Sequence, residues 1–278
     1  MTPSVDDNQM KSYALITGAA GGLGKAFAAE CAARGWDLFL TDHRSDLLAP
    51  LAAGLTRLYG VDVLCFPSDL TDPAARQALW EEIERLRLRF HFLFNVAGNG
   101  DEGAFMDRDP DDLRTLLRLN VEATVDMNRK VLAFRDPAQN FHIVNVSSLA
   151  GFFPMPLKAV YAASKRFVID FSLALHEELK PLGVIVTVLC PAGLPTHQVS
   201  IQRIMAQGWI GQFTTVNTGY AARLTIDRAL AGKSIVIPGA INRLFRWLGG
   251  MLPAPLTAAL IGRHWQRMQK NQKRPHNS

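Results

Sequence analysis

Two side chains that could exchange a proton stand four residues apart near the middle of this 278-residue chain. Tyr161 and Lys165 occur in the segment YAASK, and residues four apart share one face of a helix. A nearby ammonium favours a phenolate, so Lys165 is expected to lower the pKa of the Tyr161 phenol from its usual value of about 10. A phenol tuned in this way can exchange a proton with an alcohol or a carbonyl group.

Two more polar residues precede this pair at the ends of predicted elements. Ser148 lies 13 residues before Tyr161 at the end of a β-rich run, and Asn120 lies 41 residues before it in LRLNVEAT. Each residue also has a structural interpretation. Asn120 could cap a helix, Ser147 could replace Ser148 as the functional hydroxyl, and Lys165 could be a solvated helix lysine.

A glycine-rich turn, TGAAGGLG, follows the first predicted strand and opens an amphipathic helix. Gly18, Gly22 and Gly24 would let the backbone approach a pyrophosphate, whose charge the free N–H groups of the helix start can meet. The spacing is G-x-x-x-G-x-G, and Ala26 after Lys25 argues against a P-loop. A tight turn without a ligand is the structural alternative.

The second predicted strand ends at Asp42, 24 residues after Gly18. A carboxylate there would accept the adenosine ribose hydroxyls of NAD and repel the 2′-phosphate of NADP. His43 and Arg44 could instead receive that phosphate. We expect NAD to be preferred, with NADP as the alternative, and a helix N-cap is the structural interpretation of Asp42.

The elements that must position these residues alternate along the chain. Apolar, β-rich runs and stretches of helical spacing follow one another about six times, as in a parallel, doubly wound sheet with helices on both faces. The sequence therefore predicts an α/β, Rossmann-type fold with seven strands. The strands are expected at 13–17, 37–41, 61–66, 91–96, 141–147, 184–190 and 234–238, and the helices at 23–34, 44–57, 73–89, 111–134, 161–180 and 219–231.

We expect a loose arm over 1–10, one domain over 11–240 with an insert at 194–218, and an extension over 241–278. The composition, 48% hydrophobic and 20% charged, suits a globular chain. Scattered histidines and three cysteines without a C-x-x-C pair give no support for a metal site and favour a reducing cytosol. The first residues lack the features of a secretory signal, so a cytoplasmic location is expected.

With these motifs in order, residues 11–240 resemble the short-chain dehydrogenase/reductase family. TGAAGGLG corresponds to its glycine turn, NVAG at 95–98 to its N-N-A-G, and IVNVSS before YAASK to its active-site strand. CPAGLPT at 190–196 is similar to its P-G-x-x-x-T segment. Two departures are Val96 in place of the second Asn and Ala192 in place of a Gly, and Ala192 restricts the backbone of that last segment.

The resemblance implies a catalytic tetrad. Tyr161 would be the acid and base, Lys165 would lower its pKa and bind the nicotinamide ribose, Ser148 would bind the substrate oxygen, and Asn120 would hold a water in a proton relay. It also implies NAD (or NADP) as the cofactor and a homodimer or homotetramer formed through 111–134 and 161–180. The cofactor contacts expected are Gly18, Gly21, Gly22, Leu23, Gly24, Asp42, Asp69, Leu70, Asn95, Ala97, Gly98, Tyr161, Lys165, Pro191, Leu194 and Thr196.

Apolar residues beside these motifs suggest a lipophilic alcohol or ketone as substrate, or else simply pack the insert on the domain. They are Phe152, Phe153, Met155, Pro156, Met205, Trp209 and Phe213. Together these features predict an NAD-linked alcohol/ketone oxidoreductase. The alternatives are an NADP-linked keto reductase, including a 3-oxoacyl thioester reductase, and a catalytically idle NAD(H)-binding sensor or scaffold.

The extension carries most of the excess charge. The chain has a net charge of +5, and residues 241–278 hold seven Lys/Arg and no Asp/Glu. The longest charge-free run, 247–262, is too short and too broken by Pro and Gly to cross a bilayer. We expect the extension either to pack on a second copy or cap the pocket, or to lie on an anionic membrane as an amphipathic segment, and we expect no nucleic-acid partner.

Overall fold

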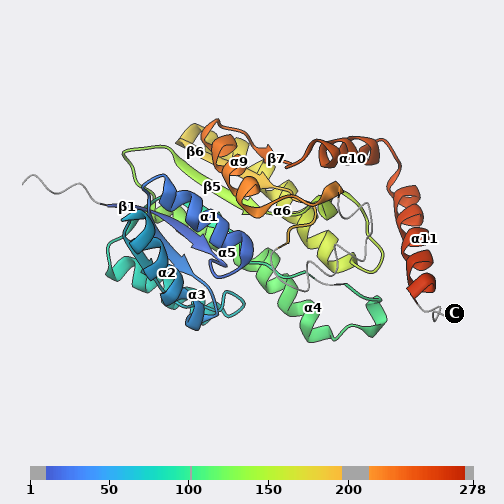
Figure 1. The fold of residues 1–278 in the computed structure, drawn as a ribbon, viewed down its shortest axis with the longest axis horizontal. Helices are drawn as coiled ribbons and strands as arrows, with labels where there is room; N and C mark the ends of the chain where they lie inside the picture. The colour runs from blue at the N-terminus through green and yellow to red at the C-terminus, as the bar shows by residue number, and fades with distance from the viewer. Residues whose placement is uncertain (1–10, 101, 196–212, 273–278) are drawn as a thin grey trace, which may run out of the picture.

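The computed structural model describes residues 11–100, 102–195 and 213–272, except for the side chains of His264 and of 266–272. Within these residues the chain forms a seven-stranded parallel sheet in the order β3-β2-β1-β4-β5-β6-β7 (Figure 1). The strands are β1 (Ser12–Thr17), β2 (Asp37–Thr41), β3 (Val63–Cys65), β4 (Arg89–Asn95), β5 (Phe141–Val146), β6 (Val184–Leu189) and β7 (Ile235–Val236). The predicted fold class is confirmed, and each strand falls on a run predicted from the sequence.

In the part of the chain that the structure describes, six helical segments connect these strands and match the predicted stretches closely. They are α1 (Gly22–Ala33), α2 (Ser45–Tyr59), α3 (Pro73–Arg85), a long segment made of α4 (Pro110–Leu117) and α5 (Ala123–Val131), α6 (Ala159–Leu179) and α9 (Thr218–Leu230). The long segment was predicted as one helix over 111–134. It contains a π-helical turn, Arg118–Glu122, between α4 and α5, which carries Asn120.

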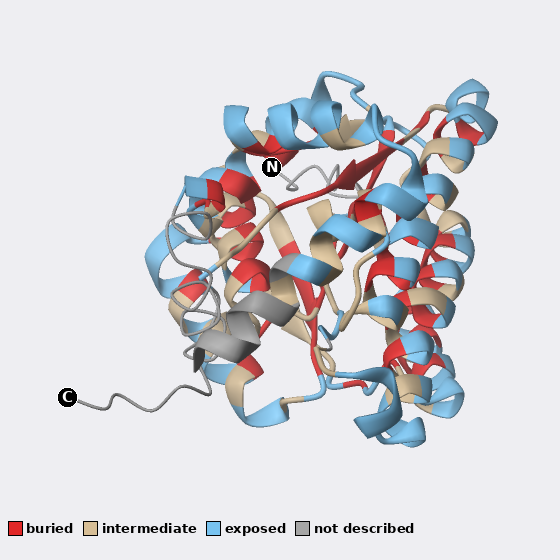
Figure 2. Cartoon of the chain, turned by 90° about the vertical axis from the view of Figure 1, so that its right-hand side faces the viewer, coloured by how far each residue is buried: buried red, intermediate tan, exposed pale blue. Residues whose placement is uncertain are grey.

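Both faces of the sheet are buried, because consecutive strand residues point to opposite sides. In β1, Ala14 and Ile16 pack in a core with residues of α1, α2 and α9, whereas Tyr13 and Leu15 pack in a second core with residues of α3 and α5. Figure 2 shows the buried residues concentrated in the strands and on the inner sides of the helices. This packing explains why the strand sequences are apolar throughout.

Two further helices follow β7. They are α10 (Ala240–Gly250) and α11 (Ala254–Gln272), with Pro253 between them. Figure 1 shows both beyond α6, at the edge of the molecule opposite α2 and α3. A third small core, which includes Val168 and Ile169 of α6, lies between α6 and the β6 end of the sheet.

Candidate active site

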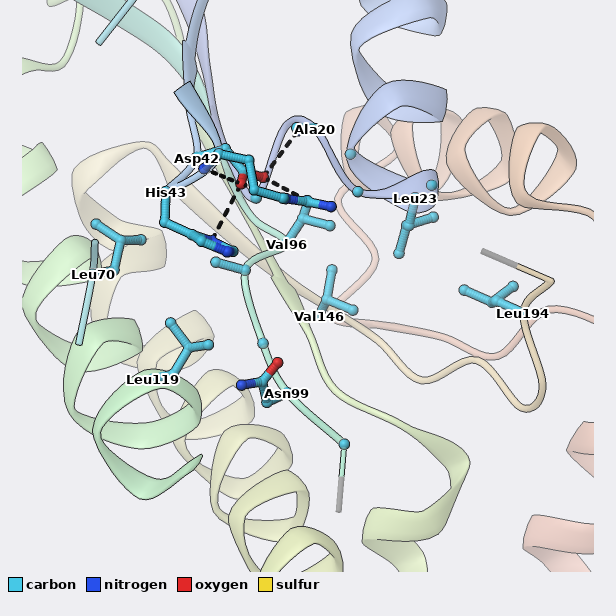
Figure 3. A pocket seen from close by; sticks show the side chains of 18 of the residues that line it. Ala20, Leu23, Asp42, His43, Leu70, Val96, Asn99, Leu119, Val146 and Leu194 are labelled. Atoms are coloured by element: carbon cyan, nitrogen blue, oxygen red, sulfur yellow. Dashed lines mark hydrogen bonds and ion pairs between the residues drawn. The ribbon is translucent and has the colours of Figure 1, made fainter. Parts of the chain in front are cut away.

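A cavity of about 960 Å³ lies where the strands end. Its lining comes from the segments that follow β1, β2, β3, β4, β5 and β6, so it occupies the carboxyl edge of the sheet, where open parallel sheets bind nucleotides. In Figure 3, Leu23 and Leu194 lie on one side of it and Leu70 and Leu119 on the other. The predicted residues in its lining are Gly18, Gly21, Gly22, Leu23, Gly24, Asp42, Asp69, Leu70, Ala97, Gly98, Ser148, Tyr161, Lys165, Pro191 and Leu194.

The glycine turn forms one wall of this cavity and is closely packed behind it. Gly18 has a φ of 62°, and a Cβ there would lie 2.7 Å from the Ala97 backbone nitrogen. A Cβ on Gly24 would lie 2.1 Å from the Gly18 carbonyl oxygen. Only glycine fits at these positions, and Gly22, Leu23 and Gly24 at the start of α1 line the cavity. The turn therefore suits a pyrophosphate, as the sequence predicted.

Asp42 ties the end of β2 to the glycine turn. Its Oδ2 accepts a hydrogen bond from the Ala20 N–H at 3.0 Å, and its Oδ1 accepts one from the Arg44 N–H at 3.1 Å (Figure 3). The Arg44 side chain donates to both oxygens, through Nε at 2.9 Å and Nη2 at 3.0 Å. The N-cap of α2 is Arg44, so the helix-cap interpretation of Asp42 is wrong.

This environment keeps Asp42 ionised. Burial raises the pKa of its carboxyl group, and the hydrogen bonds and charge of Arg44, together with the Ala20 N–H, lower it by more, so the net pKa is below its ordinary value. His43 Nδ1 also lies 3.3 Å from Asp42 Oδ1. The end of the cavity beside β2 thus presents a carboxylate that is covered by a guanidinium.

Tyr161 and Ser148 meet in the lining below the end of β5. Ser148 accepts a hydrogen bond from the Ala150 N–H at 3.1 Å and so caps a short 3₁₀ helix, Leu149–Phe152. Burial raises the pKa of the Tyr161 phenol, whereas a side-chain hydrogen bond with Ser148 lowers it, and the net pKa lies above its usual value. The expected lowering of this pKa by Lys165 is therefore not found, because the lowering comes from Ser148 and burial outweighs it.

Lys165 is buried, with only 6% of the residue exposed, so it is not a solvated helix lysine. Its Nζ donates a hydrogen bond to the Val146 carbonyl oxygen at 3.0 Å and lies 6.0 Å from the centre of the Tyr161 ring. Burial lowers the pKa of Lys165 to about 8, an effect that the nearby Cys190 only partly opposes. The ammonium is held beside the phenol by β5 and the first turns of α6.

Asn120 stands behind Lys165 and braces the loop after β4. It accepts a hydrogen bond from the Asn99 N–H and donates one to the Asn99 carbonyl oxygen, both at 2.9 Å. A Cβ added to Gly98 would lie 3.0 Å from Asn120 Oδ1 and 3.1 Å from Lys165 Nζ, so the three residues adjoin. Asn120 does not cap a helix. It lies within a π-helical turn, a feature found frequently at functional sites.

Some predicted residues do not reach the described cavity. Asn95 is buried and donates a hydrogen bond to Asn145 Oδ1 at 2.8 Å, which links β4 to β5. Ser147 donates to the Lys165 carbonyl oxygen at 2.6 Å and so anchors α6, although it also borders the cavity. Thr196, Met205 and Trp209 lie outside the described residues.

The apolar residues expected at the substrate mouth make other contacts. Phe152 lies under Arg246, with the guanidinium carbon 4.9 Å from the ring centre, and Phe153 packs against Gly249. Pro156 adjoins Gly262. Among the described residues these side chains meet α10 and α11 and do not line the cavity.

Other residues in the lining were missed by the sequence reasoning. They include Ala20, Ser68, Thr71, Asn99, Gly100, Thr115, Leu119 and Val146. Several of them directly follow the end of a strand. That position in the sequence could have predicted their place in the cavity lining. Thr115 and Leu119 are reached only because the long helical segment runs past the cavity, which no local pattern indicates.

A glycine turn at a strand end, a carboxylate on the next strand and a Tyr-Lys pair in one cleft define a dinucleotide-binding oxidoreductase site. The family model described as short chain dehydrogenase matches residues 12–204. The chain therefore belongs to the short-chain dehydrogenase/reductase family.

Curated relatives match a stretch of similar length. Human 17-beta-hydroxysteroid dehydrogenase type 3 is 34% identical over 190 residues, which is 67% of this chain and 60% of that protein. Sulfoacetaldehyde reductase 2 of Chromohalobacter salexigens is 34% identical over 190 residues, 68% of this chain and 75% of that protein. The very-long-chain 3-oxoacyl-CoA reductase of Anas platyrhynchos is 31% identical over 199 residues, 69% of this chain and 62% of that protein. The chain thus matches about three fifths of the length of the first and third of these relatives.

Solved structures agree over more of the chain. A short-chain dehydrogenase from Sphingobium yanoikuyae in complex with NADPH is 28% identical, with a TM-score of 0.72, over 96% of this chain and 98% of that chain. A short chain dehydrogenase/reductase from Burkholderia phymatum in complex with NAD is 26% identical, with a TM-score of 0.75, over 86% of this chain and 92% of that chain. Family members of this fold thus bind either nicotinamide dinucleotide.

Proposed function

We propose that the protein is a nicotinamide-dependent oxidoreductase that interconverts a lipophilic secondary alcohol and a ketone. The observation that carries this proposal is the juxtaposition of Tyr161, Ser148 and Lys165 in the cavity that the glycine turn also lines. A protein that only bound the dinucleotide would have no use for an acid and base there. The names of two relatives, a hydroxysteroid dehydrogenase and a very-long-chain 3-oxoacyl-CoA reductase, support a lipophilic substrate.

In this proposal each residue has a defined task. The bound nicotinamide supplies or accepts the hydride. Ser148 and the Tyr161 hydroxyl hold the substrate oxygen, and Tyr161 transfers the proton to or from it. Lys165 binds the nicotinamide ribose and stabilises charge that develops on the phenol, while Asn120 holds Lys165 and a relay water in place.

The neutral form of Tyr161 is the one that can assist the carbonyl-reducing half of this interconversion. Its raised pKa keeps the phenol neutral near pH 7, and a neutral phenol is the form that can donate a proton to a carbonyl oxygen. Lys165, with a pKa of about 8, carries its positive charge below that pH. We therefore expect reduction to decline as the pH rises through about 8 and Lys165 loses its proton.

We propose NAD as the preferred cofactor, because the ionised Asp42 lines the cavity and a carboxylate repels a 2′-phosphate. One observation favours NADP as the second candidate. The Arg44 guanidinium already covers both oxygens of Asp42, and it could move onto a phosphate instead.

Titration of intrinsic tryptophan fluorescence with NADH and NADPH separates the two cofactors. Asp42→Asn keeps an oxygen that can accept the Ala20 N–H but loses the charge, so it should shift the preference toward NADPH. Arg44→Ala should leave NADH binding intact. If the unchanged protein binds NADPH more tightly, and Arg44→Ala weakens NADPH alone, the NAD assignment is wrong.

Activity itself is tested with a panel of ketones of increasing apolar size, in the presence of each reduced cofactor. The loss of nicotinamide absorbance measures turnover. We expect larger apolar ketones to give the higher kcat/KM. Equal values for small polar and large apolar ketones would refute the lipophilic substrate class and leave the oxidoreductase assignment standing.

A further inference from the structure

Helix α10 is amphipathic, and the side that contacts the fold is the one that carries its polar residues, of which Asn242 is buried and Arg243 and Arg246 are exposed. Asn242 is buried and donates hydrogen bonds to the carbonyl oxygens of Thr214, at 3.0 Å, and Pro238, at 2.8 Å. Arg243 donates to the Ile237 carbonyl oxygen. Gly249 and Arg246 pack on the Phe153 and Phe152 rings. These contacts fix which side of the helix is turned toward the fold.

The opposite side of α10 is apolar and lies in solvent. At 100° per residue its large apolar side chains fall within one arc of about 160° that excludes the four residues just named as contacting the fold. Trp247 is 61% exposed and Leu244 is 51% exposed. The exposed apolar residues of this arc are Ile241, Leu244, Phe245, Trp247, Leu248, Met251 and Leu252, the last two lying just after the helix. We call this set the outer face.

Helix α11 extends the outer face. Its inner side packs on the loop before α6, where Gly262 adjoins Pro156 and the Lys158 ammonium lies 5.2 Å from the centre of the Trp265 ring. Leu256 and Leu260 are both 47% exposed. They share one side of the helix with the exposed Arg263, at i, i+4 and i+7.

Two surfaces could cover the outer face: a second copy of this chain or a lipid membrane. The charge of the segment decides between them. Residues 241–278 contain seven Lys/Arg and no Asp/Glu. In a two-fold symmetric dimer the outer face would meet its own copy, and Arg263, which shares one side of α11 with Leu256 and Leu260, would approach its copy without an acidic partner from the same segment. An anionic lipid surface instead attracts the cations and accepts the apolar side chains.

We propose that the outer face of α10, together with Leu256 and Leu260 of α11, docks the protein onto an anionic membrane surface. The contact is peripheral, since among the described residues no helix has the length and hydropathy to cross a bilayer. Besides the residues around β7, α10 packs on the 3₁₀ helix that begins after Ser148. Docking would therefore place the reacting centre near the lipid, a consequence that rests on the proposed function.

Sedimentation of the full chain with vesicles tests the docking without any assay of activity. One vesicle contains phosphatidylcholine alone, and the other contains equal parts of phosphatidylcholine and phosphatidylglycerol. We expect binding to the anionic vesicle, weaker binding at high salt, and little binding to the neutral vesicle. Leu244→Glu/Trp247→Glu/Leu248→Glu should lower the bound fraction by about tenfold or more, because three apolar side chains are lost and three charges of the wrong sign are added.

A matched variant keeps this test specific. Leu58→Glu/Leu182→Glu/Leu230→Glu makes the same change in charge at exposed leucines outside the extension and should bind vesicles almost as the unchanged chain does. Equal losses in both triple variants would overturn the proposal, and so would binding that is the same on neutral and anionic vesicles. A third outcome would also overturn the proposal. If the chain does not bind vesicles, and light scattering shows a dimer that only the α10 variant dissociates, then a second copy covers the outer face.

Discussion

Helices α6 and α10 are both amphipathic, yet they are turned in opposite directions. In α6, Val168, Ile169 and Leu179 are buried against the fold, as is normal for a helix beside a sheet. In α10 the buried residue is Asn242, and Trp247 and Leu248 are exposed. The difference shows that an apolar stripe indicates only that a helix packs against some apolar surface. In α10 the polar residues contact the fold, so the apolar stripe is left for a surface outside the chain.

The two regions also use polar groups differently. Around α6, buried polar side chains such as Lys165 and Asn120 are fixed by hydrogen bonds to backbone atoms. Removing one of them should therefore change chemistry or stability. On the outer face of α10, the exposed side chains should matter little to folding or to turnover of a soluble substrate. The following predictions test this contrast.

The largest effect is expected at Tyr161. Tyr161→Phe removes the hydroxyl that transfers the proton, so kcat for ketone reduction should fall by about 10³-fold, with cofactor affinity nearly unchanged. Trp247→Phe, an aromatic change on the outer face, should leave turnover of a water-soluble ketone as it was. Steady-state kinetics and fluorescence titration measure both quantities. Full turnover by Tyr161→Phe would refute its role as acid and base.

A pair of glycine substitutions gives the next largest contrast. Gly24→Ala places a Cβ 2.1 Å from the Gly18 carbonyl oxygen, and it should cost at least about 3 kcal/mol of unfolding free energy and weaken cofactor binding. Gly250→Ala meets nothing within 4 Å and should change stability by less than about 0.5 kcal/mol. Urea titration compares them. Similar midpoints for the two variants would contradict the packing of the glycine turn.

A smaller effect concerns acid stability. Burial lowers the pKa of His91 to about 4, with a further contribution from the charge of His142, and burial lowers the pKa of His142 to about 4. In the unfolded chain His titrates near 6.5, so between pH 6.5 and pH 4 the unfolded chain binds more protons than the folded chain. The free energy of unfolding is therefore retained above pH 6.5 and falls as the pH drops toward 4. From pH 7.5 to pH 5 the loss should be about 2 kcal/mol for each histidine.

His142→Phe tests this prediction, because the ring stacks on Phe92 at 4.6 Å and phenylalanine keeps that contact without a titrating group. The fall in urea midpoint between the two pH values should become about half as large. His43→Phe, at a histidine whose side chain is 68% exposed, serves as the matched control. An unchanged fall in the His142 variant would mean that other groups set the acid sensitivity.

Much of the fold and part of the site could be predicted from local patterns. Unbroken apolar runs predicted the buried strands, and the positions of Gly18, Asp42, Ser148 and Tyr161 at strand or helix ends placed them at one edge of the sheet. Such ends meet because the strands are parallel.

Other features depend on contacts between distant residues. The raised pKa of Tyr161 reflects burial, which spacing does not report. Arg44 covering Asp42 and Asn95 turning to Asn145 are choices of side-chain partner. In α6, Phe167 and Phe171 stack on each other and Phe167 is 39% exposed, an arrangement that helical spacing alone does not indicate.

The central claim, hydride transfer at the cavity beside Tyr161, is tested most directly by isotope transfer. The protein is given a lipophilic ketone and a reduced nicotinamide cofactor carrying deuterium at the hydride-donating position, and the alcohol is examined by mass spectrometry. The account predicts deuterium on the carbinol carbon of the product, with almost none formed by Tyr161→Phe. An alcohol without deuterium, or no oxidation of either cofactor by any ketone of the panel, would contradict it.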